Sequence, residues 1–73
     1  MRWEDIVAAN LKQLRKERRL TQEKLAFESG VAVRHIRAIE GAKTSATVGA
    51  LGKLSEALEV HPSAFLVDPA SYS

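Results

Sequence analysis

The chain has 73 residues, no cysteine and a formal net charge of +2. A chain this short forms one domain at most, with a modest core. The lack of cysteine excludes disulfides and thiolate metal sites. His35 and His61 lie far apart in the sequence without other ligand-type neighbours, which argues against a structural zinc site. Helix packing, helped by dimerisation, remains as the source of stability.

Nothing in the sequence indicates a membrane segment or a secretion signal. No apolar run approaches the roughly 18 residues that span a bilayer. The N-terminus turns acidic at Glu4 and Asp5 and has no signal-peptide core. We therefore expect a cytoplasmic protein, which agrees with the absence of cysteine.

The positive charge is concentrated in the middle of the chain. Residues 10–45 hold nine Lys/Arg and four Glu, a net +5, whereas residues 1–9 and 46–73 carry −1 and −2. A basic block is expected of a module that meets phosphate, and a solvated helical surface has the same composition. Charge alone leaves both interpretations open.

Apolar residues recur at helical spacing and period-2 alternation is missing, so an all-α fold is predicted. The first helix is expected over Glu4–Arg18. Thr21 is the predicted N-cap of a second helix, Gln22–Ser29, which ends at Gly30 because glycine accepts a left-handed conformation. A third helix is expected over Val33–Glu40.

The second half of the chain predicts two further helices. Thr47 is the expected N-cap of the helix Val48–Leu58, in which Gly49 and Gly52 either lower helix stability or admit a close neighbour. Pro62 opens a short fifth helix, and Phe65 and Leu66 close the core. The predicted organisation is one five-helix domain over residues 1–66 and a flexible tail over residues 67–73.

The segment from Gln22 to Ile39 has the residues that two short helices joined by a tight turn require. Ala26 is small enough for the helix crossing, and Gly30 supplies the positive φ of the turn. The apolar residues that would bury the pair are Leu25, Val31, Ile36 and Ile39.

With these residues in place, the chain from about Asn10 to Leu66 resembles the Cro/repressor-type helix-turn-helix family, also called XRE. The positions that carry the resemblance are Leu14-Arg15, Leu20-Thr21-Gln22-Glu23, Leu25-Ala26, Gly30-Val31, Ile36, Ile39-Glu40, Leu54 and Ala57-Leu58. The run Glu-Lys-Leu-Ala-Phe-Glu-Ser-Gly also resembles restriction–modification controller proteins. The resemblance implies a lambda-repressor-like domain that binds double-stranded DNA, with the third helix in the major groove.

The resemblance also implies roles for individual residues. Gln22, at the start of the second helix, would contact a DNA phosphate. Five outward positions of the third helix would face DNA: Ala32, Val33, Arg34, Arg37 and Ala38. Three residues just beyond it would lie near the DNA backbone: Lys43, Thr44 and Ser45. Arg15 and Glu40 match an internal salt bridge of the family.

Each role has a plainer alternative. Arg34 and Arg37 could be merely solvated, but DNA contact is favoured because arginine to guanine is the commonest specific base contact. Val33 reads a thymine methyl or is a surface apolar residue, and both remain open. His35 is expected to be a packed or dimer-side residue rather than a proton switch. Trp3 is expected to fill the core rather than to stack on a base.

The chain departs from the family where Ala32, Val33, Ala46 and the pair Gly41-Ala42 stand, so base-by-base specificity does not carry over. We expect a transcriptional regulator that binds a palindromic operator as a homodimer. The expected dimer surface uses the last two helices and the tail, including Val60, Pro62, Phe65 and Leu66.

The alternative is a protein-interaction module, antitoxin-like or a fold relative that no longer binds DNA. An enzyme is the weakest hypothesis, because the sequence offers no nucleophile–base set, metal cluster or phosphate-cradling glycine loop. No cofactor and no small-molecule ligand are expected.

Overall fold

The computed structural model describes residues 2–68, and within them it contains helices and no strand. The elements are α1 (Trp3–Glu17), α2 (Gln22–Ser29), α3 (Val33–Glu40), α4 (Val48–Leu58) and a 3-10 helix, η1 (Pro62–Phe65). The all-α prediction is confirmed. The second, third and fourth helices have the predicted bounds, and the first is displaced by one residue at each end.

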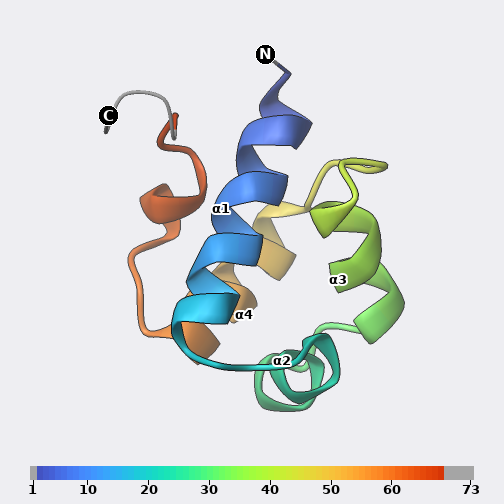
Figure 1. Cartoon of the computed structure of the whole chain (residues 1–73), viewed down its shortest axis with the longest axis vertical. Coiled ribbons are helices and arrows are strands. Elements are labelled where there is room, and N and C mark those ends of the chain that lie inside the picture. Colours follow the sequence, from blue (N-terminus) through green and yellow to red (C-terminus); the bar gives the residue numbers. More distant parts are fainter. Residues whose placement is uncertain (1, 69–73) are drawn as a thin grey trace.

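The helices surround α1, which runs along the centre of the molecule (Figure 1). α2 crosses near the C-terminal end of α1 and is seen end-on, and α3 returns along one side. α3 packs against α1 and α2, while η1 packs against α1 and α4 on the other side. None of these helices has both the length and the apolar composition needed to span a membrane.

Side-chain caps define where two of the helices begin. The Thr21 hydroxyl accepts the backbone N–H of Lys24 at 3.0 Å, and the Thr47 hydroxyl accepts that of Ala50 at 3.0 Å. Each cap binds an amide that has no partner inside its helix. Both predicted N-caps are therefore confirmed.

The core lies between all five elements. Its fully buried large side chains are Leu11, Leu25, Ile36, Ile39, Leu54, Leu58 and Phe65. Every element contributes at least one of them, so the predicted apolar faces do meet in a single cluster.

The predicted fifth helix is wrong in kind, because the structure forms a single 3-10 turn of four residues. His61 caps this turn by accepting the N–H of Ser63 at 3.1 Å through Nδ1. Asn10 of α1 then donates from Nδ2 to the carbonyls of Phe65 and Val67, at 2.8 and 2.7 Å. The segment after Phe65 is therefore bound to α1 instead of continuing a helix. The predicted flexible tail comprised residues 67–73; of these, the Val67 carbonyl is bound to Asn10, and residues 69–73 lie outside the described residues.

The prediction that Trp3 fills the core is wrong. Trp3 is 64 % exposed, because it is the first residue of α1, and α1 begins at one end of the long axis of the molecule (Figure 1). Of the two residues predicted to close the core, Phe65 is fully buried as expected, whereas Leu66 is 48 % exposed and the prediction for it is wrong.

The two glycines of α4 do not admit a close neighbour within the described chain. A Cβ built at Gly49 or Gly52 meets no atom within 4 Å. Of the two explanations open from the sequence, only the lower helix propensity therefore applies within one chain.

Candidate nucleic-acid interface

The turn between α2 and α3 sets the angle of α3. Gly30 has φ +80°, in the left-handed region that only glycine adopts without strain, and its N–H donates to the carbonyl of Ala26 at 2.9 Å. The Ser29 hydroxyl accepts the N–H of Val31 at 3.1 Å, and Val31 is buried. The backbone thus changes direction in a defined conformation, and α3 begins at Val33, shortly after this turn.

α3 buries one face and exposes the other. Ile36, Ile39 and Glu40 face inward, whereas Arg34 and Arg37 are exposed. Of the other predicted contact residues, Ala32 is exposed, and Val33 and Ala38 are half-buried on the same helix. The structure therefore brings all five predicted residues of this helix to one accessible region.

The two arginines of α3 differ in their surroundings. Arg34 makes no hydrogen bond or ion pair within residues 2–68. Arg37 donates from Nη2 to Glu23 Oε2 at 2.6 Å and from Nε to Gln22 Oε1 at 3.3 Å. Arg37 is therefore fixed to the first turn of α2, and Arg34 is not.

A buried ion pair between α1 and α3 lies beneath the exposed face of α3. Arg15 donates from Nε to Glu40 Oε2 at 2.7 Å and from Nη2 to Oε1 at 3.0 Å, and its Nη1 reaches the carbonyl of Leu20 at 2.7 Å. The side chains of Arg15 and Glu40 are only 13 % and 4 % exposed. The hydrogen bonds to Glu40 raise the pKa of Arg15 above its ordinary value, so the guanidinium stays charged.

Gln22 connects the buried pair to the surface. Its Nε2 donates to Glu40 Oε1 at 3.0 Å, while its Oε1 accepts from Arg37. The sequence placed Gln22 at a phosphate; the structure adds that its amide already joins two helices. One hydrogen of Nε2 remains for a further acceptor.

The loop after α3 is anchored to the start of α1. Lys43, Thr44 and Ser45 are exposed, and the Ser45 hydroxyl donates to Glu4 Oε2 at 2.9 Å. Arg2 donates to the carbonyl of Ala42 at 3.3 Å. A hydrogen bond from its own backbone N–H, and then the one from Ser45, hold the pKa of Glu4 below its ordinary value. Ser45 is therefore less available to a DNA phosphate than Lys43.

Two features of this surface were not found from the sequence. Glu23 was not recognised as the partner of Arg37, because no sequence rule pairs residues 14 apart on two helices that cross. Phe27 is 83 % exposed, with the Lys24 ammonium 5.4 Å from its ring centre. Phe27 and Val33 line a shallow groove at the turn.

His35 is half-buried against the molecule, and its Nε2 atom is buried without a hydrogen-bond partner in residues 2–68. Its placement agrees with the predicted packing role. No three carboxylate or imidazole side chains of the described residues gather in a way that could hold a metal ion.

The short α2, the glycine turn and the exposed basic face of α3 together define a helix-turn-helix domain. A family model described as HTH_3, helix-turn-helix, matches residues 11–65, and the chain belongs to this family of Cro/repressor (XRE) type regulators. A comparison with curated proteins gives no match.

Three solved structures are similar to this chain. The hypothetical transcription factor NHTF from Neisseria superposes with a TM-score of 0.90 at 22 % identity, over 97 % of this chain and 82 % of that one, which shows a shared fold. The restriction–modification controller protein C.AhdI from Aeromonas hydrophila has a TM-score of 0.81 at 27 % identity, over 85 % and 94 %. An HTH_3 family transcriptional regulator from Vibrio cholerae has a TM-score of 0.86 at 31 % identity, over 96 % and 39 %.

Proposed function

We propose that the protein is a transcriptional regulator that binds double-stranded DNA sequence-specifically, as a homodimer on a palindromic operator in the cytoplasm. The main support is the outer face of α3, where Arg34 has no partner among residues 2–68 and Arg37 keeps unused donors. An α-helix fits the major groove of DNA, where the contact of arginine with guanine is the commonest specific base contact. Within this proposal the protein is not an enzyme and needs no cofactor or small-molecule ligand.

The other contact residues take supporting roles in this proposal. Gln22 donates its second Nε2 hydrogen to a phosphate, and Lys43 and Thr44 lie beside the backbone, with Ser45 contributing less because Glu4 holds it. Val33, Ala32 and Ala38 give close contact with base edges. The Arg15–Glu40 pair is structural and keeps α3 at its angle to α1.

A homodimer is part of the proposal because one recognition helix contacts only a few base pairs. Phe65, which the sequence suggested for the dimer surface, is fully buried and is removed from it. Leu66 stays, and the exposed Trp3 joins it, since both line one cleft together with Leu51. Val48 is also exposed on α4.

The experiment that tests the function is a selection from a random duplex pool, followed by titration of the selected sequence at two salt concentrations. We expect an enriched palindrome whose affinity falls steeply with salt, as counterion release requires. Weak binding that treats all sequences alike would contradict the proposal.

Replacing the arginines of α3 tests their assignment. Arg34→Ala and Arg37→Ala should each weaken operator binding by roughly 1–3 kcal/mol if they read bases. Unchanged affinity in both variants, with unaltered circular dichroism, would remove them from the interface.

A second candidate function is a protein-binding module, which the exposed Phe27 beside the Val33 groove favours. If the selection enriches no sequence, we expect Phe27→Ser to abolish co-purification of a partner from the source cells. Arg34→Ala should leave that partner bound.

A further inference from the structure

Arg37 uses only one edge of its guanidinium in contacts with residues 2–68. The group is a planar fork with five N–H donors. Nε and Nη2 lie on one edge of the group, and these two nitrogens donate to Gln22 and Glu23. Nη1 makes no hydrogen bond in residues 2–68, and Nη2 keeps one of its two hydrogens, so both nitrogens at the end of the fork have donors left.

The position of Arg37 is determined by a chain of contacts that begins in the buried region. Glu40, held by Arg15, accepts from Gln22 Nε2. This fixes the Gln22 amide with its oxygen toward Arg37, because the reversed amide would set its NH₂ against the guanidinium and its oxygen against the carboxylate. Glu23 then accepts from the same edge of the fork.

Stability does not explain the Arg37–Glu23 pair. The two side chains are 53 % and 66 % exposed, and ion pairs of this kind add little to folding. The pair instead limits the rotamers of Arg37 before any ligand arrives, so that less conformational entropy is lost on binding. It also offsets the charge of the Glu23 carboxylate, which lies beside the exposed face of α3.

We propose that Glu23 is a specificity-determining residue, which with Gln22 holds Arg37 so that the free end of its fork reads a guanine. This inference rests on the proposed DNA-binding function. The two acceptors of guanine in the major groove, O6 and N7, match two parallel donors of one guanidinium. Arg34, which has no such support, contributes less discrimination between bases.

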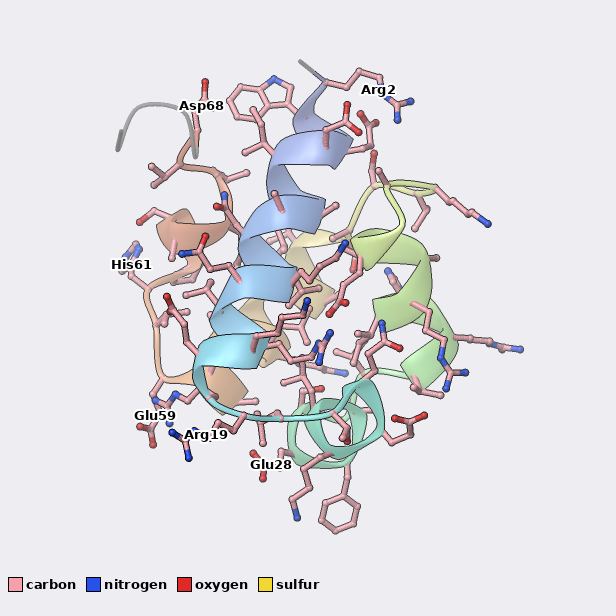
Figure 2. The ribbon with its side chains drawn as sticks, in the orientation of Figure 1. Arg2, Arg19, Glu28, Glu59, His61 and Asp68 are labelled. Atoms are coloured by element: carbon pink, nitrogen blue, oxygen red, sulfur yellow. The ribbon has the colours of Figure 1, made fainter. Side chains whose placement is uncertain are left out.

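The test compares Glu23→Gln with a matched control, Glu28→Gln. Both changes remove one carboxylate from α2, and Glu28 pairs with Lys24 at 3.9 Å rather than with Arg37. In Figure 2 Glu28 extends from α2 away from α1. The probe is the selected operator and a set of duplexes in which each G·C pair of one half-site is replaced singly.

We expect Glu23→Gln to reduce the discrimination at one G·C pair per half-site by about tenfold, the lower part of the range for a bidentate contact. Arg37→Lys should lose discrimination at the same pair, because an ammonium cannot make the fork. Glu28→Gln should retain it. Equal thermal midpoints would establish that all three variants fold.

Two results would overturn the inference. Glu23→Gln could bind all duplexes more tightly with unchanged discrimination between bases. Glu23 would then act only by repelling the negatively charged DNA. Alternatively, Glu23→Gln and Arg37→Lys could affect different base pairs. In both cases the operator itself still binds, so the proposed function stands. If no operator is selected at all, the proposed function fails and this inference fails with it.

Discussion

The helix-turn-helix unit and the end of the molecule at the N-terminus of α1 differ in how firmly contacts within one chain hold them in place. In the unit, a threonine cap, a glycine turn and a buried ion pair fix α2 and α3. At the other end α1 starts without a side-chain cap, and Trp3 and Leu66 are exposed. Contacts within one chain fix the geometry of the first region, although Phe27 is exposed on it, whereas the second region has few such contacts and leaves Trp3 and Leu66 as apolar surface for a partner.

The largest effect on stability should come from the buried ion pair that supports the helix-turn-helix unit. Glu40→Ala leaves Arg15 buried without its carboxylate and should lower the free energy of unfolding by about 3–5 kcal/mol. Urea denaturation measures it. The control is Arg18→Ala, which breaks the exposed pair with Glu59 and should change stability by at most about 1 kcal/mol. Equal effects of both changes would contradict the distinction between buried and exposed pairs.

The glycine turn should show a smaller loss. Gly30→Ala places a Cβ in open space, so only the positive φ opposes it. We expect a destabilisation of about 1–2 kcal/mol, the usual penalty for an L-residue in the left-handed region. A thermal midpoint equal to that of the unchanged protein would show that the turn adopts another conformation.

At the other end of the molecule, where Arg2 binds the carbonyl of Ala42, a substitution should raise the stability instead of lowering it. Ala42 has φ +57° although it carries a Cβ, so its backbone is strained. Ala42→Gly should raise the free energy of unfolding by up to about 1 kcal/mol, since strain relief exceeds the added entropy of the unfolded chain. Ala9→Gly, in the exposed middle of α1, is the control and should lower it by about 1 kcal/mol. A loss in both variants would refute the strain at Ala42.

The smallest effect concerns acid. Arg2 lowers the pKa of Asp5, and Arg18 lowers that of Glu59, each through a hydrogen bond, in addition to the lowered pKa of Glu4. A pKa that is lower in the folded state gives stability that is present above the ordinary carboxyl pKa and lost as the pH falls through the folded one. The melting temperature should therefore decrease below about pH 4.5, and less so in 1 M salt. A constant melting temperature down to pH 3 would mean that these surface contacts do not persist in solution.

Local signals in the sequence were sufficient for most of the fold. Thr21, Thr47 and Gly30 act through their own backbone neighbourhood, so their roles could be inferred from residue type and spacing. Trp3 was misplaced because burial depends on which elements cover a helix end. The 3-10 turn was mistaken for a helix because the contacts of Asn10 with Phe65 and Val67 join distant parts of the chain.

The same division applies to the candidate site. The outward positions of α3 could be predicted from the helical period and the family resemblance, and their contacts with DNA remain predictions. The contact of Arg37 with Glu23 depends on the geometry with which α2 and α3 cross. The sequence predicts that a helix-turn-helix motif is present, but not which side chains of its two helices meet. The side-chain contact behind the proposed specificity was therefore harder to predict than the presence of the motif.

The exposure of Trp3 also provides a spectroscopic reporter. It is the only tryptophan of the chain, so all indole emission comes from the first turn of α1. If a second subunit covers the cleft of Trp3, Leu51 and Leu66, the emission shifts to shorter wavelength as the protein concentration increases. The dissociation constant of the dimer can then be read from unlabelled protein, without DNA.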